Sequence, residues 1–392
     1  MHFVIIGAGE CGVRAAFALR ENGFDGAITI LSSERQLPYE RPPLSKRSRL
    51  EPKLIRAAAD YEAVRIDLRR GVQVDAIHPT RKHLQVGGNV LTYDKLLITT
   101  GARARTEPAF GGCHTLRTLE DAGDLVPRLI QGRRIGIIGA GFIGLELAAT
   151  ARLAGADVSV FQFGPQVLAR AVPPQVADLV AARHRYEGVH LHLDTTVVAA
   201  DATSITLVGG ERLTFDTVIA GIGSVPNVEL ALGAGLGVLN GILVDHCLRT
   251  SDPDIFAAGD CCQFPWRGKL LRLESWRAAQ DQGSHAAAAM LGSNTAYDAL
   301  PWFWSDQYDL TLQVAGLFDP NLPIHERNTQ PFGKLLFQCD AVGELAAAAG
   351  IGIGNDQAKD FRILEKLIER KIKVLPTAIS DASNSLKSLL RT

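Results

Sequence analysis

The chain has 392 residues, of which 46% are hydrophobic and 21% are charged, and these values predict a globular protein of two or three domains. Its 41 basic and 42 acidic residues give a formal net charge of −1, which argues against nucleic acid as a partner because such proteins usually carry a basic excess. No apolar run reaches the roughly 18 residues that span a membrane, and Met1-His2 leads directly into a strand-like segment. We therefore expect a cytoplasmic protein without a signal peptide that binds no membrane.

A glycine-rich pattern occurs twice, as GAGECG at 7–12 and as GAGFIG at 139–144. Each copy follows a short apolar strand, and each precedes an alanine- and leucine-rich helical stretch, expected at 13–19 and 145–153. In a dinucleotide-binding turn, the first glycine permits the tight turn and the second lets the backbone approach a pyrophosphate. The third lets the helix pack on the strand, and the helix N-terminus attracts the phosphates. Two such turns predict two dinucleotides, with electrons moving between them.

The order of the elements indicates one nucleotide-binding domain inserted into another. A first β–α alternation begins at residue 3 and a second at 134, after which the chain returns to a segment ending in Ala258-Gly259-Asp260. We expect strands at 73–77, 84–86, 96–99, 310–314 and 334–339, a loop at 36–50 and a helix at 357–370. The predicted fold is α/β, with two Rossmann-like domains and a C-terminal α+β domain. The predicted boundaries are 1–105 with 225–304 for the discontinuous domain, 106–224 for the inserted domain and 305–392 for the last.

The six cysteines form neither CxxC nor CxxxxC, and Cys261 and Cys262 are adjacent, where a disulfide would be strained. We therefore expect small buried or loop thiols and no metal site. A disulfide reductase of this general plan needs a redox cysteine facing its flavin, whereas no cysteine lies between Cys11 and Cys113. His325-Glu326 is expected in a loop, which leaves the C-terminal region without the His–Glu arrangement of such enzymes.

Several longer motifs resemble those of one known family. They are PYERPPLSK at 38–46, LRTLEDA at 116–122, GFIGLELAA at 141–149, AGD at 258–260 and PWFWSDQ at 301–307. Over essentially its full length the chain resembles FAD-dependent pyridine-nucleotide oxidoreductases of the ferredoxin-reductase type. The nearest resemblance is to reductase components of bacterial aromatic-ring dioxygenases, with putidaredoxin-type reductases a little further away. It implies FAD on the discontinuous domain, NADH on the inserted domain, and a [2Fe–2S] ferredoxin that accepts single electrons.

The resemblance also assigns residues to the FAD. The pyrophosphate would be held by Gly7, Gly9, Cys11 and Gly12. The strand after the first helix ends near Ser33 and Glu34, and either or both would bind the adenosine ribose hydroxyls, although a turn serine and a solvated charge are the alternatives. Asp260, after Gly259, would bond the ribityl chain, the alternative being a turn aspartate. Further expected cofactor contacts are Arg41, Val74, Gly101, Arg117 and Gly223, the alternatives being a plain strand residue for Val74 and a surface charge for Arg117.

Three residues are expected at the site of hydride transfer. By the resemblance, Lys46 lies near the flavin, where its ammonium stabilises negative charge on the reduced ring. Glu146 would pair with Lys46, although an acid in the first turn of a helix also complements the helix dipole by about 0.3–1 kcal/mol. Trp276 aligns with a position beside the flavin, where it would stack or gate, the alternative being a core tryptophan.

The resemblance places NADH on Gly139, Gly141, Ile143 and Gly144. The following strand ends in Gln162, where NAD-specific relatives usually carry glutamate. An amide still binds a ribose hydroxyl, but a neutral hydrogen bond contributes about 0.5–1.5 kcal/mol against roughly 1.5–3 for a charged one. The amide also lacks the negative charge that repels a 2′-phosphate, and Arg170 would attract such a phosphate. We therefore predict a preference for NADH with only modest discrimination against NADPH.

The predicted function is a ferredoxin–NAD(+) reductase of a multicomponent oxygenase, an aromatic-ring dioxygenase in the first place. A putidaredoxin- or rubredoxin-type reductase serving a P450 or another oxygenase is the alternative. A disulfide reductase and a redox-sensing flavoprotein are further alternatives. The chain is expected as a monomer or homodimer. The sequence names neither the ferredoxin nor the aromatic substrate.

Overall fold

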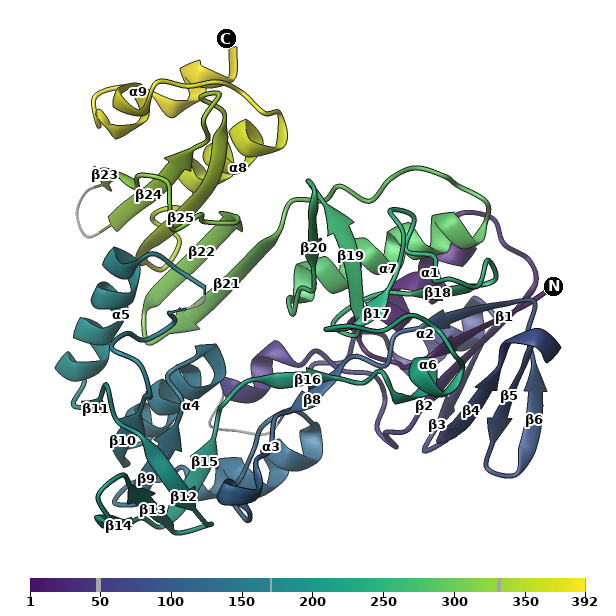
Figure 1. Cartoon of the computed structure of the whole chain (residues 1–392), viewed down its shortest axis with the longest axis horizontal. Coiled ribbons are helices and arrows are strands. Elements are labelled where there is room, and N and C mark those ends of the chain that lie inside the picture. The colour runs from purple at the N-terminus through teal and green to yellow at the C-terminus, as the bar shows by residue number, and fades with distance from the viewer. Residues whose placement is uncertain (47–50, 170, 330–332, 392) are drawn as a thin grey trace. The chain divides into compact units, whose positions relative to one another are not determined.

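The computed structural model describes residues 1–46, 51–169, 171–329 and 333–391, and the chain divides into two compact units (Figure 1). The first unit comprises Met1–Arg41, Glu51–Arg103 and Ser224–Ala299. The second comprises Pro42–Leu50, Ala104–Gly223 and Leu300–Thr392. Each unit is thus assembled from segments far apart in sequence. The three predicted domain boundaries remain a prediction.

A parallel sheet of five strands forms the centre of the first unit. Its strands in spatial order are β18 (Ile255–Ala257), β7 (Lys95–Ile98), β1 (His2–Ile6), β2 (Ala27–Ser32) and β3 (Ile66–Arg70). These strands are rich in β-branched and leucine side chains, and most of these side chains are buried, as expected of a sheet covered on both faces. The strand order reverses beside β1, which has β2 and β3 on one side and the later strands β7 and β18 on the other. Such a reversal creates the crevice at which open α/β sheets bind ligands.

Helix α1 (Glu10–Glu21) connects β1 to β2 and packs along α7 (Trp276–Met290). Helix α1 begins immediately after the second glycine of the first motif, three residues earlier than the helical stretch expected from 13. The smaller elements of the unit are β4 (Val74–His78), β5 (His83–Val86), β6 (Asn89–Thr92), β17 (Ile242–Leu243), β19 (Cys262–Trp266), β20 (Lys269–Leu271), β16 (Ser224–Pro226), α2 (Ala58–Ala63) and α6 (Glu229–Gly233). The predicted strands at 73–77, 84–86 and 96–99 correspond to β4, β5 and β7.

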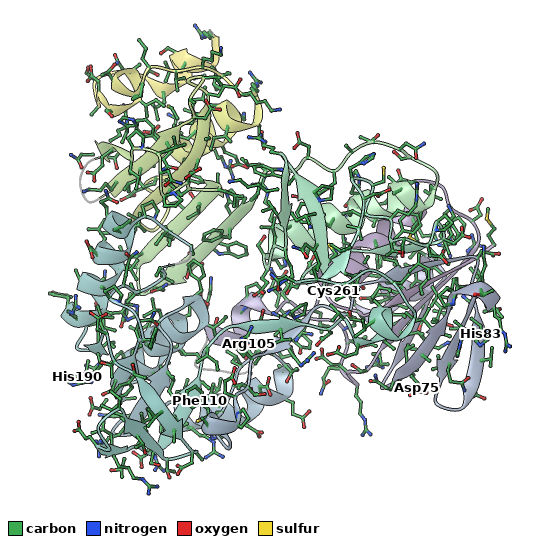
Figure 2. The ribbon with its side chains drawn as sticks, viewed as in Figure 1. Asp75, His83, Arg105, Phe110, His190 and Cys261 are labelled. Atoms are coloured by element: carbon green, nitrogen blue, oxygen red, sulfur yellow. The ribbon has the colours of Figure 1, made fainter. Side chains whose placement is uncertain are left out.

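The second unit repeats the β–α–β plan. Its parallel sheet has the order β11 (His190–His192), β10 (Asp157–Phe161), β9 (Arg134–Ile138) and β15 (Thr217–Ala220). The other elements of this part are α3 (Leu119–Leu125), α4 (Phe142–Leu153), α5 (Pro174–Tyr186), β12 (Val197–Ala200), β13 (Ser204–Leu207), β14 (Arg212–Thr214) and the 3-10 turns at Pro42–Ser45 and Pro108–Phe110. Phe110 packs against the core formed by Phe161, Ile205 and Val218 (Figure 2). Part of the expected loop at 36–50 is thus a short 3-10 turn that belongs to this unit.

The second unit also contains an antiparallel sheet of five strands. Its strands in spatial order are β21 (Trp302–Gln307), β22 (Leu310–Gly316), β25 (Leu345–Ile353), β24 (Gly333–Cys339) and β23 (His325–Thr329). Helix α8 (Ala358–Glu369) packs on β25, followed by α9 (Pro376–Ser380) and a 3-10 turn at Leu386–Arg391. The ring of Phe142, at the start of α4, lies edge-on to that of Phe303 on β21, with centroids 5.1 Å apart. This contact joins the start of the second motif's helix to the C-terminal sheet.

The fold class predicted from the sequence is confirmed, including the strands at 310–314 and 334–339 and the helix at 357–370. One expectation was wrong. His325-Glu326 lies in β23 rather than in a loop, because β23 is an edge strand whose polar side chains hide the alternation of a typical strand. Among the described residues, no helix is both long and apolar enough to cross a bilayer.

Candidate active site

The first glycine motif has the geometry that a dinucleotide requires. A Cβ atom on Gly7, whose φ is +107°, would lie 2.2 Å from the carbonyl oxygen of Thr99, and one on Gly12 would lie 2.0 Å from that of Gly7. The fold itself therefore demands both glycines. Gly9 differs, because its φ of −73° suits any residue and a Cβ there would meet no described atom within 4 Å. The second glycine thus opens a space at the N-terminus of α1, as a bound pyrophosphate needs.

The second motif repeats this geometry. A Cβ atom on Gly139 (φ +99°) would lie 2.4 Å from the carbonyl oxygen of Gly221, and one on Gly144 would lie 2.2 Å from that of Gly139. At Gly141, the N-cap of α4, the corresponding Cβ would meet nothing within 4 Å in the described part of the chain. Ile143 is 42% exposed in the first turn of the helix. Both motifs therefore fit a dinucleotide pyrophosphate, and they lie in different units.

In the first unit the structure brings the first motif against the segment that ends in Asp260. A Cβ on Gly259 would lie 3.2 Å from the Cβ of Cys11, and the φ of +81° at this position favours glycine. The Gly259 amide donates to Oε1 of the buried Gln282 at 2.7 Å. Cys11 and Gly259, predicted for one cofactor from positions far apart in sequence, therefore lie in contact.

The two candidates for the ribose differ in their surroundings. The Glu34 carboxylate accepts from Arg41 Nη2 at 2.6 Å and from the hydroxyl of Tyr39. Ser33 is exposed and lies just beyond the end of β2. Glu34 therefore already holds two donors, and Arg41 serves to fix it. Both residues remain predictions for the ribose contact.

The remaining predicted FAD contacts are divided between the units. Val74 is buried on β4, and Gly101 (φ +66°) follows β7, both in the first unit. Arg117 and Gly223 belong to the second unit. The Arg117 amide donates to Oδ2 of Asp121 at 2.8 Å, next to the cap of α3. The Gly223 carbonyl accepts from the amide of Arg105 at 2.9 Å. Their cofactor roles remain predictions.

Trp276 belongs to a contact that sequence reasoning missed. Its indole Nε1 donates to Glu10 Oε2 at 2.9 Å, and Gln280 Nε2 donates to Glu10 Oε1 at 2.8 Å. Burial raises the pKa of Glu10, while these two hydrogen bonds act in the opposite direction. Glu10 directly follows the second glycine of the first motif. The contact therefore ties Trp276, the first residue of α7, to the proposed pyrophosphate loop.

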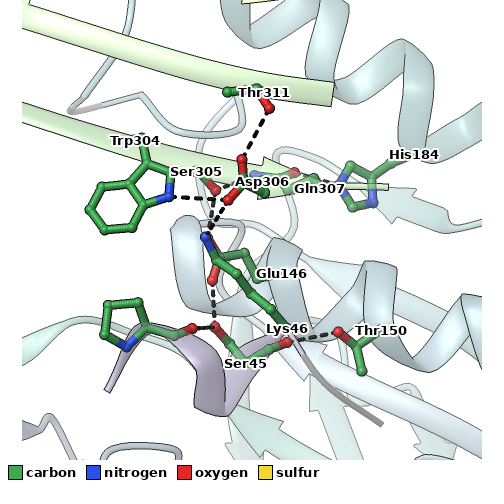
Figure 3. A network of polar contacts seen from close by, with 11 residues as sticks. Ser45, Lys46, Glu146, Thr150, His184, Trp304, Ser305, Asp306, Gln307 and Thr311 are labelled. Atoms are coloured by element: carbon green, nitrogen blue, oxygen red, sulfur yellow. Dashed lines mark hydrogen bonds and ion pairs between the residues drawn. The ribbon is translucent and has the colours of Figure 1, made fainter. Parts of the chain in front are cut away.

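Lys46 and Glu146 do meet, as the resemblance implies, but a second acid lies closer to the lysine (Figure 3). Lys46 Nζ is 3.6 Å from Glu146 Oε1 and 3.0 Å from Asp306 Oδ2. Asp306 also accepts from Trp304 Nε1 and from the hydroxyl of Thr311, both at 3.1 Å. Asp306 lies within the PWFWSDQ motif, yet nothing in its spacing pointed to Lys46. The sequence thus predicted the pair but missed its third member.

Glu146 is only 6% exposed, and burial raises the pKa of its carboxyl group, although Lys46, Ser305 and Ser45 act in the opposite direction. Ser305 Oγ donates to its Oε1 at 2.6 Å, and Ser45 Oγ donates to its Oε2. Both carboxylate oxygens therefore face donors. A buried carboxylate held in this way can orient a polar ligand group without water competing for it.

Gln162 lies just after β10, against the second motif. Its Oε1 accepts from the amide of Ala140 at 2.9 Å, so the oxygen faces the glycine loop and Nε2 remains as a donor. A donor at this point suits a ribose oxygen and also a 2′-phosphate. Arg170, the other residue predicted for this end of NADH, lies outside the described residues.

The six cysteines are free thiols, and Cys261 lies in the interior of the first unit (Figure 2). Burial raises the pKa of Cys11, Cys261 and Cys262. It also raises that of Cys113, to about 11. Because the thiolate is the reactive form, these cysteines are poor nucleophiles at neutral pH. In the described residues, no group of acidic, histidine or cysteine side chains could hold a metal ion.

Comparison with known proteins agrees with this geometry. The family model described as pyridine nucleotide-disulphide oxidoreductase matches residues 1–283, and that described as reductase C-terminal matches 302–390. The chain belongs to the pyridine nucleotide-disulphide oxidoreductase family. The family resemblance inferred from the motifs is therefore confirmed, as is the prediction of an oxidoreductase that uses FAD and NADH.

Individual relatives match this chain over nearly their whole length. The chain is 40% identical to the anthranilate 1,2-dioxygenase system ferredoxin–NAD(+) reductase component of Burkholderia cepacia, covering 99% of each chain. It is 42% identical to rhodocoxin reductase of Rhodococcus erythropolis, covering 99% of this chain and 94% of the relative. The structure also resembles a chain in the crystal structure of the covalent putidaredoxin reductase–putidaredoxin complex. The TM-score is 0.93 at 34% sequence identity, and the match covers 100% of this chain and 98% of that chain. The enzyme is thus a flavoprotein reductase of the ferredoxin-reductase type.

Proposed function

We propose that this enzyme takes hydride from NADH bound at the second glycine motif and delivers electrons, one at a time, to a small [2Fe–2S] ferredoxin. The observation that carries this proposal is the pair of open glycine cradles at Gly9 and Gly141, each beneath a helix N-terminus. FAD bound at the first cradle supplies the exchange between two-electron and one-electron chemistry. We infer an aromatic-ring dioxygenase as the final recipient, because a relative at 40% identity is such a component.

The side chains of the second unit have distinct roles in this proposal. Glu146, buried and fixed by two serine hydroxyls, orients the carboxamide end of NADH, since both of its oxygens are held in place. Lys46, held between Glu146 and Asp306, supplies positive charge where negative charge develops during reduction. Gln162 donates to the adenosine ribose, while Arg170, assigned from the sequence to the same end of NADH, lies outside the described residues. Gly139, Gly141, Ile143 and Gly144 hold the NADH pyrophosphate.

The residues assigned to FAD position it and restrict its movement. Gly7, Gly9, Cys11 and Gly12 hold the pyrophosphate, and Gly259 with Asp260 approaches the ribityl chain. Ser33 or Glu34 binds the ribose, with Arg41 fixing Glu34. Trp276, anchored through Glu10, shields the flavin face. Val74, Gly101, Arg117 and Gly223 complete the proposed set of contacts. We further propose that the enzyme works in the cytoplasm as a monomer or homodimer.

Replacement of Lys46 tests the catalytic part of the proposal. In rapid mixing of fully flavinylated Lys46→Ala with NADH, flavin reduction should slow by about a hundredfold, as expected when one electrostatic stabiliser is removed. FAD retention should change far less. Lys53→Ala is the matched control, because Lys53 pairs with Glu40 on the surface of the first unit. Equal reduction rates in the Lys46 and Lys53 variants would refute the role of Lys46.

The identity of the electron acceptor needs a separate experiment. NADH oxidation should be measured with a [2Fe–2S] ferredoxin of a dioxygenase system, a P450-type ferredoxin, a rubredoxin and glutathione disulfide. The proposal expects the dioxygenase ferredoxin to be reduced fastest. Faster reduction of the P450-type ferredoxin or the rubredoxin would favour the alternative that the rhodocoxin and putidaredoxin reductase relatives suggest. Reduction of the disulfide alone would overturn the proposal.

A further inference from the structure

A buried chain of hydrogen bonds runs from α5 to the Glu146 carboxylate (Figure 3). His184 Nε2 lies 2.8 Å from Gln307 Oε1, and Gln307 Nε2 donates to Ser305 Oγ at 3.1 Å. Ser305 Oγ then donates to Glu146 Oε1 at 2.6 Å. The exposed fractions of these four side chains are 0%, 5%, 1% and 6% from His184 to Glu146. These four side chains are therefore shielded from bulk solvent.

All donors in this chain point in one direction. An amide oxygen only accepts, so the His184–Gln307 bond requires the proton on His184 Nε2. Gln307 then uses its nitrogen toward Ser305, whose hydroxyl proton is directed at Glu146. His184 Nδ1 is left as an acceptor, with the Tyr308 hydroxyl 3.4 Å away. Successive bonds of this polarity strengthen each other, and the last donor faces an oxygen that accepts best when Glu146 is ionised.

The chain of hydrogen bonds connects three elements that are far apart in the sequence. His184 lies on α5, Ser305 and Gln307 lie on β21, and Glu146 lies on α4. Beside the chain is a cavity of about 10 Å³, lined among others by Val180, His184 and Gln307, with room for about one water molecule. Because this space holds no more than about one water molecule, Gln307 has few ways to replace a lost partner. A change at His184 should reach Glu146 rather than being absorbed by solvent.

We propose that His184 is a positioning residue that acts through Gln307 and Ser305 to hold the Glu146 carboxylate ionised and in a single orientation. This proposal rests on the proposed function only in placing Glu146 at the NADH site. Its physical content, the coupling of His184 to Glu146, stands on the hydrogen bonds alone.

The neighbouring charges make this coupling useful. Lys46 and Asp306 face Glu146, and burial raises the pKa of its carboxyl group against the effect of Lys46 and the two serines. Arg183 and Glu187 are the charged neighbours of His184, where burial lowers the pKa to about 4. At neutral pH His184 is therefore uncharged, and its Nε2 proton stays directed at Gln307. The chain of hydrogen bonds from His184 through Gln307 and Ser305 to Glu146, here called the relay, acts as a fixed support rather than as a proton switch.

The test measures the titration of Glu146 itself in the oxidised holoenzyme. Infrared difference spectra across a pH series should contain a carboxyl band that disappears in Glu146→Gln, which identifies it. In His184→Leu the apparent pKa of that band should rise by about half a unit, the share of one charged hydrogen bond lost when a polarising link is removed. His184→Gln should restore the wild-type value, because its amide nitrogen can again donate to Gln307.

The controls separate the relay from packing. Val180→Ala enlarges the same cavity without touching the chain, and it should leave the Glu146 band unmoved even where thermal stability falls. Gln307→Met interrupts the chain at its centre and should reproduce the rise, so the test survives if His184→Leu does not fold. A shift in Val180→Ala as large as that in His184→Leu would overturn the proposal. An unmoved band in both His184→Leu and Gln307→Met would do so as well.

The proposed function fails in a different way. Flavin reduction by NADH is measured on the same variants, and the relay predicts that its pH profile shifts together with the infrared band. If the band shifts while the reduction rates stay unchanged, the relay stands and Glu146 is not part of the NADH site. An unmoved band refutes the relay whatever the electron acceptor is.

Discussion

Replacing the second glycine of each motif should separate the two cofactor sites without damaging the fold. Gly9 and Gly141 have φ values of −73° and −81° and extended ψ, which alanine adopts without strain. A Cβ at either position would touch none of the described atoms within 4 Å. The added methyl group therefore meets only what binds there. Gly9→Ala should weaken FAD binding, whereas Gly141→Ala should retain FAD and weaken NADH.

The expected magnitude follows from the hydrogen bonds at a helix N-terminus. A methyl group that displaces a pyrophosphate from one backbone N–H removes a charge-assisted bond of about 1.5–3 kcal/mol. Since about 1.4 kcal/mol is a tenfold change in Kd, affinity should fall by about 10- to 150-fold. The apoprotein should lose no more than about 1 kcal/mol, the scale of changes at an N-cap. By contrast, Gly12→Ala brings a Cβ to 2.0 Å from the Gly7 carbonyl oxygen and should prevent folding of this turn.

The assay combines three measurements on each variant. Thermal unfolding of the apoprotein reports the fold, quenching of FAD fluorescence reports its Kd, and flavin reduction at increasing NADH concentration reports NADH binding. Wild-type affinities in both variants would refute the idea that the open glycines receive pyrophosphates. Loss of FAD in Gly141→Ala, with FAD retained in Gly9→Ala, would reverse the assignment of the two motifs.

Three further outcomes are expected. Gln162→Glu should raise the ratio of kcat/KM for NADH over NADPH by about tenfold or more, because a carboxylate repels the 2′-phosphate. A wild-type preference for NADH over NADPH above about a thousandfold would contradict the role given to the Gln162 amide. Acidification should destabilise the enzyme through His184, because burial lowers the pKa of this histidine from 6.5 to about 4 on folding. A contribution of about 3 kcal/mol to the free energy of unfolding is therefore present above pH 6.5 and lost as the pH falls through 4. Acid unfolding curves of His184→Gln should lack this loss. Brief alkylation of the native holoenzyme at pH 7 should leave NADH-dependent dye reduction intact, because burial keeps the thiols protonated, and complete inactivation would revive the disulfide-reductase alternative.

The features predictable from sequence are those encoded by short-range spacing. Strand, glycine turn and helix follow each other within about 20 residues in both motifs, so their geometry was recognisable before any contact was known. The partners of Lys46 and Glu10 were not. Lys46 meets Asp306, and Glu10 meets Trp276, across 260 and 266 residues respectively. Spacing within one sequence carries no information on such contacts, since they depend on how the segments pack.

The wrong expectation of a loop at His325-Glu326, where the structure has strand β23, has a different cause. On β23 only Arg327 is buried, and its guanidinium donates to the carbonyl oxygens of Ile379 and Asp381. A buried arginine that satisfies backbone carbonyls occupies the place where a strand normally shows an apolar residue. The alternation on which sequence-based prediction depends is therefore absent. Only the pairing with β24 reveals the strand.

The two glycine motifs share their backbone geometry but differ in how they are covered, and this difference bears on cofactor exchange. In the first motif Cys11 is 6% exposed and packs against Gly259, so the segment leading to Asp260 closes over the turn. In the second motif the equivalent Ile143 is 42% exposed. The first turn is therefore covered by a second chain segment at this position, whereas the same position of the second turn is exposed. The covering thus supports a retained FAD at the first motif and a NADH that exchanges in each turnover at the second.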